Sequence, residues 1–298
     1  MLRIKKYGAI DIGSNAIRLL ITNIIEGENG SAPQFKKADI IRVPVRLGQD
    51  VFTKGYITEP NINRMTEAIQ AFKLLMDVHG VVRYKACATS AMREATNGSD
   101  VKLHIAEQTQ IQIDIIDGKK EAEIISFTDL NKNLERDKSY LYVDVGGGST
   151  ELTVIDQLKI TESKSFKIGS VRLLNKTVDK KTIWPEIEHW IKSNTSELSK
   201  VQVIGSGGNI NKVFKMSGKP LNTSLSYAYL KAQHKFLKNM SYEDRIVKLG
   251  LNTDRADVIV PATKIYLNAM KWSGAKKIFV PKIGLSDGII KSMYFGKL

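Results

Sequence analysis

The sequence YLYVDVGGGSTE, from Tyr140 to Glu151, is the stretch that decides the fold of this chain. Its first residues alternate between two faces as in a buried strand, and three consecutive glycines predict a tight turn directly after it. Asp144 is therefore expected near the strand's end. Because glycine has no Cβ atom, the backbone N–H groups of Gly146–Gly148 can point toward a bound anion, and the Ser149 and Thr150 hydroxyls add donors. The stretch predicts a phosphate-binding hairpin.

Asp144 needs a separate explanation, because a carboxylate repels phosphate. It suits this loop chemically if it holds a divalent cation or orients a water molecule. The alternative is a glycine hairpin with an incidental aspartate, and this one stretch leaves both interpretations open.

The same pattern occurs a second time near the N-terminus. The segment GAIDIGSNAIRLLI, residues 8–21, echoes YVDVGGGSTELTVI, residues 142–155, with an apolar strand, an aspartate and a loop of small residues. Both loops lead into another apolar strand, so both predict hairpin turns. This excludes the Walker and dinucleotide-binding fingerprints, in which a glycine loop opens a helix. Two such loops indicate two related halves.

Five motifs in a fixed order carry a resemblance to a known family. From Tyr7 to Tyr294, the chain resembles the exopolyphosphatase and guanosine pentaphosphate phosphohydrolase (Ppx/GppA) family. The motifs are Asp11-Ile-Gly-Ser-Asn15, Ala88-Thr-Ser-Ala-Met-Arg93, Asp144-Val-Gly-Gly-Gly-Ser-Thr-Glu151, Ile168-Gly-Ser-Val-Arg172 and Gly205-Ser-Gly-Gly208.

The resemblance implies an α/β fold of the actin, sugar kinase and Hsp70 superfamily. Its members have two actin-like (ribonuclease H-like) domains with a cleft between them. We expect the first domain at residues 1–120 and the second at residues 121–298, with a final helix that can pack back on the first domain. The chain is expected to correspond to the short, two-domain form of the family.

The resemblance also implies a function. Family members release the terminal phosphate of inorganic polyphosphate, or the γ-position phosphate of guanosine pentaphosphate, with magnesium. We therefore expect an exopolyphosphatase in which a Mg²⁺-organised water attacks the terminal phosphorus. Three alternatives stay open: a guanosine pentaphosphate 5′-phosphohydrolase, an actin-like kinase that transfers phosphate to an acceptor, and a polyphosphate- or alarmone-binding protein without turnover.

The resemblance assigns roles to residues of this chain. Glu121 corresponds to the general base, and Asp144, Glu151 and Asp11 are the expected Mg²⁺ ligands, directly or through water. The expected phosphate-binding residues are Gly13, Ser14, Asn15, Arg18, Arg93, Gly146, Gly147, Gly148, Ser149, Arg172, Gly207 and Gly208.

Two departures from the family pattern flank the expected base. The family has two adjacent glutamates followed by alanine and arginine, whereas this chain has Lys120 for the first glutamate and Glu123 for the arginine. These departures motivate the alternative of a binding protein without turnover. The intact Glu121 argues against it.

The charge balance favours a polyanionic partner. The chain has 45 Lys plus Arg against 31 Asp plus Glu, a formal net charge of +14. The lysines are scattered as pairs, such as Lys36-Lys37 and Lys276-Lys277, so they suit either a polyphosphate-binding track or an ordinary solvated surface. Nucleic acid is disfavoured, because no nucleic-acid-binding signature stands out and aromatic residues make up only 7% of the chain.

Composition sets the remaining expectations. At 298 residues with 42% hydrophobic residues, the chain suits two domains with a core each. No apolar run approaches the roughly 20 residues that span a bilayer, so no membrane contact and a cytoplasmic location are expected. Cys87 is expected in the core, the four histidines are isolated, and a homodimer is left open.

Apolar periodicity and turn residues predict the other elements. In the first half we expect a hairpin over 7–23, a polar turn at 26–31, strands at 35–47, 84–89 and 111–116, and helices over 58–79, over 100–108 and from 117 toward 134. In the second half we expect strands within 158–168, 201–204 and 277–281, and helices from 169, at 185–198, 209–216, 227–239 and 242–249, at 255–270 with an interruption at Pro261, and from 284.

Overall fold

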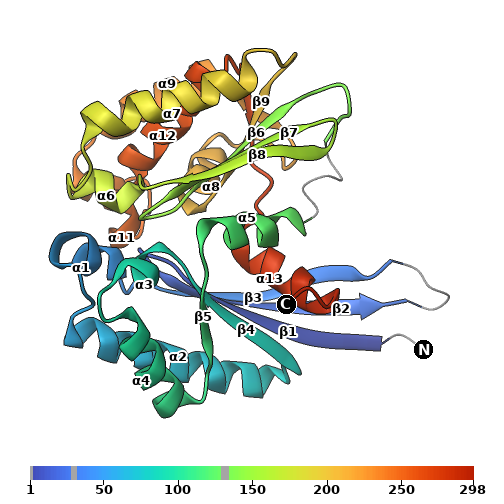
Figure 1. The fold of residues 1–298 in the computed structure, drawn as a ribbon, viewed down its shortest axis with the longest axis vertical. Coiled ribbons are helices and arrows are strands. Elements are labelled where there is room, and N and C mark those ends of the chain that lie inside the picture. Colours follow the sequence, from blue (N-terminus) through green and yellow to red (C-terminus); the bar gives the residue numbers. More distant parts are fainter. Residues whose placement is uncertain (1–2, 28–31, 129–133) are drawn as a thin grey trace. The chain divides into compact units, whose positions relative to one another are not determined.

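The computed structural model describes residues 3–27, 32–128 and 134–298. The chain forms two compact units (Figure 1): unit 1 comprises Met1–Thr128 with Leu285–Leu298, and unit 2 comprises Asp129–Gly284. The expected boundary after residue 120 would fall inside a helix. The units divide instead after Thr128, because that helix packs with the C-terminal helix in unit 1.

Unit 1 is built on a five-stranded sheet of order β3-β2-β1-β4-β5. Strands β1, β2 and β3 are antiparallel neighbours, and β4 and β5 continue the sheet in parallel with β1. Its elements are β1 (Arg3–Ile12), β2 (Ile17–Glu26), β3 (Gln34–Val43), α1 (Leu47–Lys54), α2 (Glu59–His79), β4 (Arg83–Ala88), α3 (Ser90–Glu94), α4 (Gly98–Thr109), β5 (Ile113–Ile115), α5 (Gly118–Ser126) and α13 (Leu285–Tyr294).

From Tyr7 to Ile12, strand β1 is buried on both faces because helices cover the sheet of unit 1 on both sides (Figure 1). Ile10 and Ile12 point into a core shared with Phe72 and other residues of α2. Tyr7 and Ala9 point to the opposite side, into a core with residues of α5 and α13. Asp11 follows the same alternation, so its side chain lies on the side of α5 and α13.

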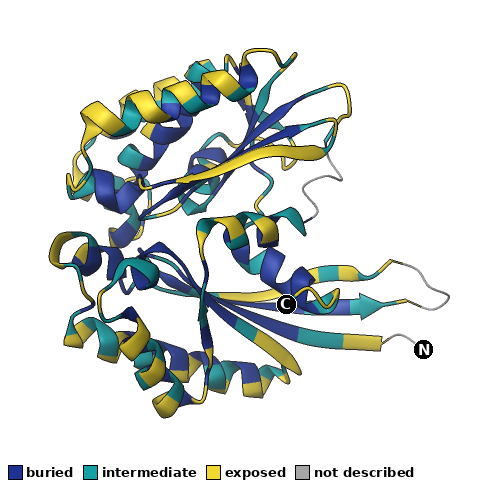
Figure 2. Ribbon diagram, in the orientation of Figure 1, coloured by how far each residue is buried: buried dark blue, intermediate teal, exposed yellow. Residues whose placement is uncertain are grey.

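Unit 2 is built on a six-stranded sheet of order β10-β11-β9-β6-β7-β8. Its central strands are buried, and the edge strand β8 is exposed along its length except at Phe166 (Figure 2). Its elements are β6 (Tyr140–Val145), β7 (Thr150–Asp156), β8 (Lys159–Phe166), α6 (Ser170–Leu174), α7 (Lys180–Thr195), β9 (Gln202–Ser206), α8 (Gly208–Met216), β10 (Ser224–Ser226), α9 (Tyr227–Asn239), α10 (Tyr242–Val247), α11 (Thr253–Ala256), α12 (Ile259–Trp272) and β11 (Lys277–Phe279).

The two sheets repeat one arrangement, as the two sequence copies predict. In unit 1, the β1–β2–β3 meander is followed by β4, which pairs in parallel with β1. In unit 2, the β6–β7–β8 meander is followed by β9, which pairs in parallel with β6. Asp11 and Asp144 therefore occupy equivalent places near the ends of the first strands of the two meanders.

Several expected elements differ from those observed. The third strand ends at Val43 and not at residue 47, because Leu47 already begins the amphipathic helix α1. The long helix expected over 255–270 is two helices, and Pro261 lies in the first turn of α12, where its missing N–H costs nothing. Helix α5 ends at Ser126. Its expected continuation over 129–133 and most of the polar turn expected at 26–31 lie outside the described residues.

Two further expectations concern single features. Cys87 is a free, fully buried cysteine on β4. Its burial, followed by the negative charge of Asp114, raises the pKa of its thiol to about 12, so the thiol stays protonated.

Within the described residues, no helix combines the length and the apolar character that a membrane crossing requires.

Candidate active site

Both small-residue loops are tight hairpin turns, as predicted. In unit 1, the Gly13 N–H donates to the Ala16 carbonyl at 3.1 Å. In unit 2, the Gly146 N–H donates to the Ser149 carbonyl at 3.0 Å. The same hydrogen bond thus closes the turn after each aspartate-bearing strand.

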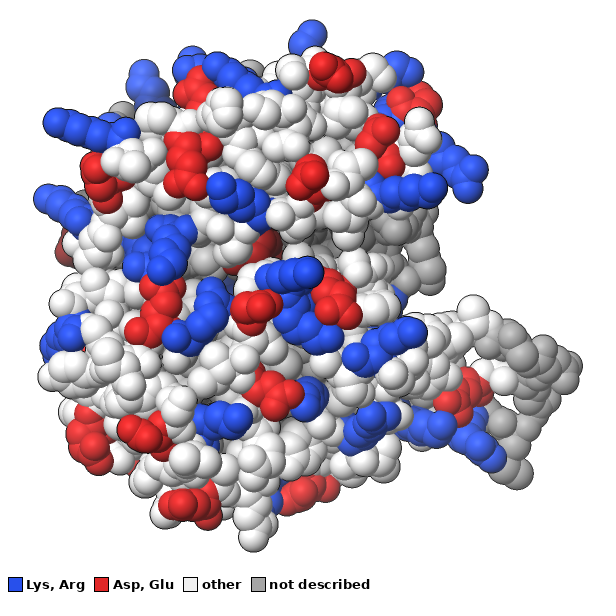
Figure 3. All heavy atoms as spheres, in the orientation of Figure 1, with Lys and Arg blue, Asp and Glu red and all other residues white. Residues whose placement is uncertain are grey.

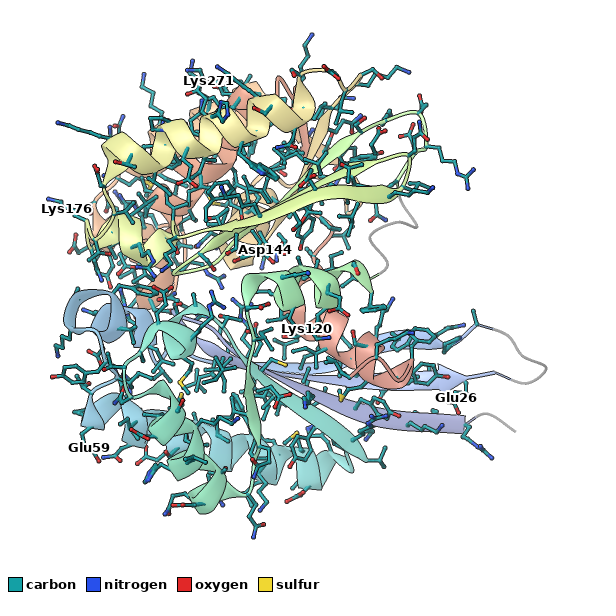
Figure 4. The ribbon with its side chains drawn as sticks, in the orientation of Figure 1. Glu26, Glu59, Lys120, Asp144, Lys176 and Lys271 are labelled. Atoms are coloured by element: carbon teal, nitrogen blue, oxygen red, sulfur yellow. The ribbon has the colours of Figure 1, made fainter. Side chains whose placement is uncertain are left out.

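In unit 2, two carboxylates face each other across neighbouring strands. Asp144 of β6 is paired in register with Glu151 of β7, so both side chains lie on the same face of the sheet (Figure 4 labels Asp144). Glu151 is only 3% exposed. Directly opposed like charges destabilise a sheet, and a cation between them removes that cost.

This pair fits Mg²⁺. Magnesium usually binds proteins through one or two carboxylates and completes its shell with waters and substrate phosphates. Over residues 3–27, 32–128 and 134–298, no group of three or more His, Cys, Asp and Glu side chains is placed to hold a metal ion. A two-carboxylate site at Asp144 and Glu151 is consistent with that finding, because waters and substrate phosphates can complete a magnesium shell.

Hydroxyl groups position both carboxylates. Ser165 donates to Glu151 Oε1 at 2.9 Å. Ser206 and Tyr142 donate to Asp144 Oδ2 at 3.1 and 3.4 Å. Such hydrogen bonds orient a metal-binding carboxylate and are part of its function. Sequence reasoning missed these three residues as site residues, although Ser206 stands inside the quoted Gly205–Gly208 cluster.

The glycine loop of unit 2 packs against the start of α6. The N–H groups of Ser170 and Val171 donate to the carbonyls of Gly146 and Gly147 at 3.0 and 2.9 Å. The buried Arg172 donates through Nε to the Gly148 carbonyl at 2.7 Å. The carbonyls of the loop therefore face α6, and the observed contact of Arg172 holds the loop in shape. Binding of phosphate by Arg172 stays a prediction.

Glycine is required at two places around this loop. A Cβ atom on Gly169 would overlap the backbone carbonyl of Gly147. Gly207 has φ 114°, a backbone conformation that residues other than glycine rarely adopt. It directly precedes Gly208, the first residue of α8. The hydroxyl of the fully buried Tyr266 donates to the carbonyl of Ser206, which fixes this turn beside Asp144.

In unit 1, the equivalent aspartate faces a positive charge. Asp11 is in register with Arg18 of β2, and Arg18 Nη1 lies 3.5 Å from Asp11 Oδ2. Burial raises the pKa of Asp11, and the Arg18 charge opposes this effect. The guanidinium thus occupies the position that Glu151 has in unit 2, which makes Asp11 a weaker candidate for a metal ligand than Asp144.

The loop of unit 1 is fixed by neighbouring segments. Ser14 Oγ lies 2.8 Å from Ser90 Oγ at the start of α3. The backbone carbonyls of Ser14 and Asn15 accept hydrogen bonds from the N–H groups of Gly48 and Arg46 at 2.7 and 3.1 Å. These contacts tie the loop to the starts of α1 and α3. Sequence reasoning did not assign Ser90, Arg46 or Gly48 to the site.

The predicted base, Glu121, is a buried side chain in the first turn of α5. Asp117 caps this helix by accepting from the Lys120 N–H at 2.7 Å. Glu121 is 8% exposed and lies one turn before Ile124, which packs in the core on the side of α5 and α13. The negative charges of both Asp11 and Glu121 act on the Cys87 thiol. The structure therefore brings Asp11 and Glu121 to the same side of the sheet of unit 1.

The two residues that depart from the family pattern pair with each other. Lys120 Nζ lies 3.1 Å from Glu123 Oε2, and both side chains are exposed (Figure 4 labels Lys120). The positive and negative charges have exchanged places relative to the family pattern and form a surface ion pair. This pair leaves Glu121 in its buried position.

Arg93 connects α3 to the segment before α5. Its Nη1 donates to the carbonyl of Ile116 at 2.6 Å. Because a guanidinium carries five N–H donors, this bond fixes the side chain and leaves other donors for an anion. Arg93, Asp11, Glu121 and the Gly13–Asn15 loop all belong to unit 1, whereas Asp144, Glu151 and the other glycine loops belong to unit 2.

Comparison with known proteins identifies the family. The family model described as "Ppx/GppA phosphatase family" matches residues 34–295. A bifunctional 3-dehydroquinate synthase/phosphatase of Fusobacterium nucleatum is 28% identical over 91% of this chain, which spans 44% of that protein. A putative exopolyphosphatase of Haemophilus influenzae is 23% identical, over 97% of this chain and 92% of its own length.

Solved structures agree with these sequence relatives. The crystal structure of an exopolyphosphatase from Cytophaga hutchinsonii is 26% identical, with a TM-score of 0.82 over 98% of each chain. The Ppx/GppA family member of Aquifex aeolicus is 23% identical, with a TM-score of 0.75 over 99% of each chain, and shows the same fold. The two units therefore have the actin-like α/β fold of these proteins. This chain belongs to the Ppx/GppA phosphatase family, a family of hydrolases.

Proposed function

We propose that this chain is a cytoplasmic exopolyphosphatase that hydrolyses the terminal phosphoanhydride bond of inorganic polyphosphate. The observation that carries the proposal is the Asp144–Glu151 pair, in register on neighbouring strands beside a closed glycine turn. A pair of acidic side chains next to a phosphate-binding loop suits a reaction on a polyanion with a divalent cation. Relatives named exopolyphosphatases support the substrate class.

Asp144 and Glu151 would hold Mg²⁺ in this proposal. The ion supplies neutralisation of phosphate charge and organises the attacking water when it is bound. The hydroxyls of Tyr142 and Ser165 keep the two carboxylates oriented. The backbone N–H groups of Gly147 and Gly148 in one loop, and of Ser14 and Asn15 in the other, would bind phosphate oxygens, because those of Gly146 and Gly13 close the turns.

Glu121 would accept the proton of the attacking water. Its burial within unit 1, next to the apolar core around Ile124, keeps its position fixed. The guanidinium of Arg93 is held in place by the Ile116 carbonyl and would counter the charge of the substrate with its remaining donors. Arg18 and Asp11 neutralise each other in part, so Arg18 contributes less positive charge than Arg93 does.

The structure weighs against the alternative of a binding protein without turnover. That alternative rests on Lys120 and Glu123, which pair with each other on the exposed side of α5. Glu121 itself is buried, at 8% exposed. We therefore infer that Lys120 and Glu123 exchange the charges of the family pattern without removing the catalytic base.

Surface charge bears on the choice between polyphosphate and guanosine pentaphosphate. The net charge of +14 favours a long polyanion. On the face drawn in Figure 3, however, Lys and Arg side chains are interspersed with Asp and Glu rather than gathered into one basic patch. Guanosine pentaphosphate therefore remains the second candidate substrate.

The test is phosphate release from long polyphosphate, short polyphosphate and guanosine pentaphosphate, measured side by side with and without MgCl₂. We expect Mg²⁺-dependent release that is fastest from polyphosphate. ATP with and without candidate acceptors tests the kinase alternative. A chain that releases no phosphate from any of these substrates, yet binds polyphosphate, would overturn the proposal.

A further inference from the structure

The hydroxyl of Ser206, at the end of β9, lies within hydrogen-bond distance of two acceptors. Its Oγ is 3.1 Å from Asp144 Oδ2 and 3.0 Å from the backbone carbonyl oxygen of Ile283. A serine hydroxyl has one proton to donate, and neither an ionised carboxylate nor a carbonyl can donate in return. Ser206 can therefore fully satisfy only one of these acceptors at a time.

The two acceptors belong to functionally different parts of the chain. Asp144 is half of the carboxylate pair described above. Ile283 lies in residues 280–284, here called the link segment, which joins β11 of unit 2 to Leu285, the first residue of α13 in unit 1. Within the link segment, Lys282 has φ 53°, a left-handed conformation that is costly for a residue with a side chain.

Ser206 is held so that its hydroxyl stays between these acceptors. It is 2% exposed and in register with Asp144 across the parallel β6–β9 pair. Tyr266 donates to its carbonyl, and Gly207 turns the chain directly after it. Because the backbone of Ser206 is fixed, the remaining freedom is the direction in which its O–H bond points.

We propose that Ser206 is a positioning residue that couples cation binding at Asp144 to the order of the link segment. The inference rests on the proposed function, in which Asp144 holds Mg²⁺. Without a cation, the full charge of Asp144 attracts the Ser206 proton, because charge-assisted hydrogen bonds are the stronger ones. With a cation bound, the carboxylate is neutralised, and the proton turns to the Ile283 carbonyl. Cation binding thus fixes the segment through which the chain passes between its two units.

The test combines Mg²⁺ titration with amide hydrogen exchange on the full chain. Hydrogen exchange is followed in peptides that cover residues 279–286, at Mg²⁺ concentrations that saturate each variant. In the wild type, we expect Mg²⁺ to slow exchange in the link segment. In Ser206→Ala, we expect Mg²⁺ still to bind but its effect on the link segment to vanish, because no hydroxyl is left to turn to the Ile283 carbonyl.

Two variants serve as matched controls. Tyr142→Phe removes the other hydroxyl on Asp144 Oδ2 and leaves the Ile283 contact, so its link segment should still respond to Mg²⁺. Ser139→Ala removes a serine–carboxylate hydrogen bond to Asp156, 2.7 Å long, just before β6 begins, and should behave as the wild type in both measurements.

The outcomes separate the inference from the proposed function. Equal Mg²⁺ binding by the wild type and Asp144→Asn would refute the metal assignment, and the inference with it. If Asp144→Asn loses binding but Mg²⁺ leaves the link segment of the wild type unchanged, the inference alone is overturned. The inference also fails if Ser206→Ala keeps the full response of the link segment.

Discussion

The aspartates near the ends of β1 and β6 hold equivalent places in the two sheets but face opposite charges. Asp11 faces Arg18, and Asp144 faces Glu151. The first pair joins opposite charges, whereas the second places two like charges opposite each other. The repeated element thus carries a different charge pair in each unit, and the difference lies at a single cross-strand position.

Asp144→Ala should abolish turnover and the Mg²⁺ requirement together. The cation contributes several kcal/mol of transition-state stabilisation in such reactions, so we expect the rate to fall about a thousandfold or more. Thermal stability should not fall, because the change removes one of two opposed like charges. Phosphate release and a melting curve check this, with the exposed Asp137→Ala as control. Near-normal Mg²⁺-dependent release from a folded Asp144→Ala protein would show that the metal assignment is wrong.

Glu121→Gln should bind polyphosphate normally but hydrolyse it slowly. The amide keeps the size of the carboxylate but cannot accept a proton from water, and a positioned base contributes on the order of a hundred- to ten-thousandfold in rate. Single-turnover kinetics with a binding titration separate the two effects. Glu123→Gln, which lies two residues away but is exposed, is the matched control and should retain activity. Full activity of Glu121→Gln would exclude it as the base.

At the scale of elements, short helices fix the loops that strands present. Helix α6 holds the glycine loop of unit 2 through its first N–H groups and Arg172. Helix α1 carries Asp50, which joins it to the start of α2. Only α6 has a sequence signature, the motif Ile168–Arg172, and both helices act through the residues that they contact.

Gly169→Ala should disrupt the contact between α6 and the glycine loop. The new methyl group would overlap the backbone carbonyl of Gly147, and backbone cannot move aside as a flexible side chain can. We expect a loss of about 2–4 kcal/mol in the free energy of unfolding and a loss of phosphate release. Denaturant titration measures the first quantity. Wild-type stability of this variant would mean that the loop and α6 separate easily.

Asp50→Ala should destabilise the protein in a pH-dependent way. Burial raises the pKa of Asp50, but hydrogen bonds from Thr58 and Asn61 and the charge of Lys54 outweigh burial and lower it. A carboxyl with a lowered folded-state pKa contributes stability above its ordinary pKa of about 4, and this contribution is lost as pH falls through the folded-state value.

At pH 7 we therefore expect Asp50→Ala to lose about 2 kcal/mol, the scale of hydrogen bonds to a charged group. The difference from the wild type should shrink as the pH falls below about 4. Urea unfolding at several pH values measures it. A difference that stays constant down to pH 2 would show that packing, and not the charge of Asp50, is responsible.

At the scale of the whole molecule, net charge is the property most relevant to substrate choice. The chain carries +14, and a flexible polyanion can contact many lysines at once. By analogy with counterion release from nucleic acids, long polyphosphate should bind more tightly than guanosine pentaphosphate and lose affinity steeply with salt. Titrations at several salt concentrations check this. Equal affinities with a flat salt dependence would favour the nucleotide as substrate.

The sequence by itself determined the repeated architecture of this protein. Strand alternation, an aspartate at the strand's end and a small-residue turn are local signals, so the hairpins at Asp11 and Asp144 could be predicted from neighbouring residues alone. A tight turn sets the register of its hairpin, so the pairing of Asp144 with Glu151 could be predicted from the sequence. The family motifs added the candidate base and the arginines.

Only the tertiary structure decided what these residues contact. Two such contacts join residues far apart in the chain: Asp11 and Glu121 both act on one buried thiol, and Arg172 holds the glycine loop. The same is true of Ser206, which meets Asp144 from 62 residues away and Ile283 from 77. Such contacts depend on how helices and strands pack and on which acceptor a hydroxyl group reaches. A local pattern of residues predicts neither the packing nor the hydrogen-bond partner.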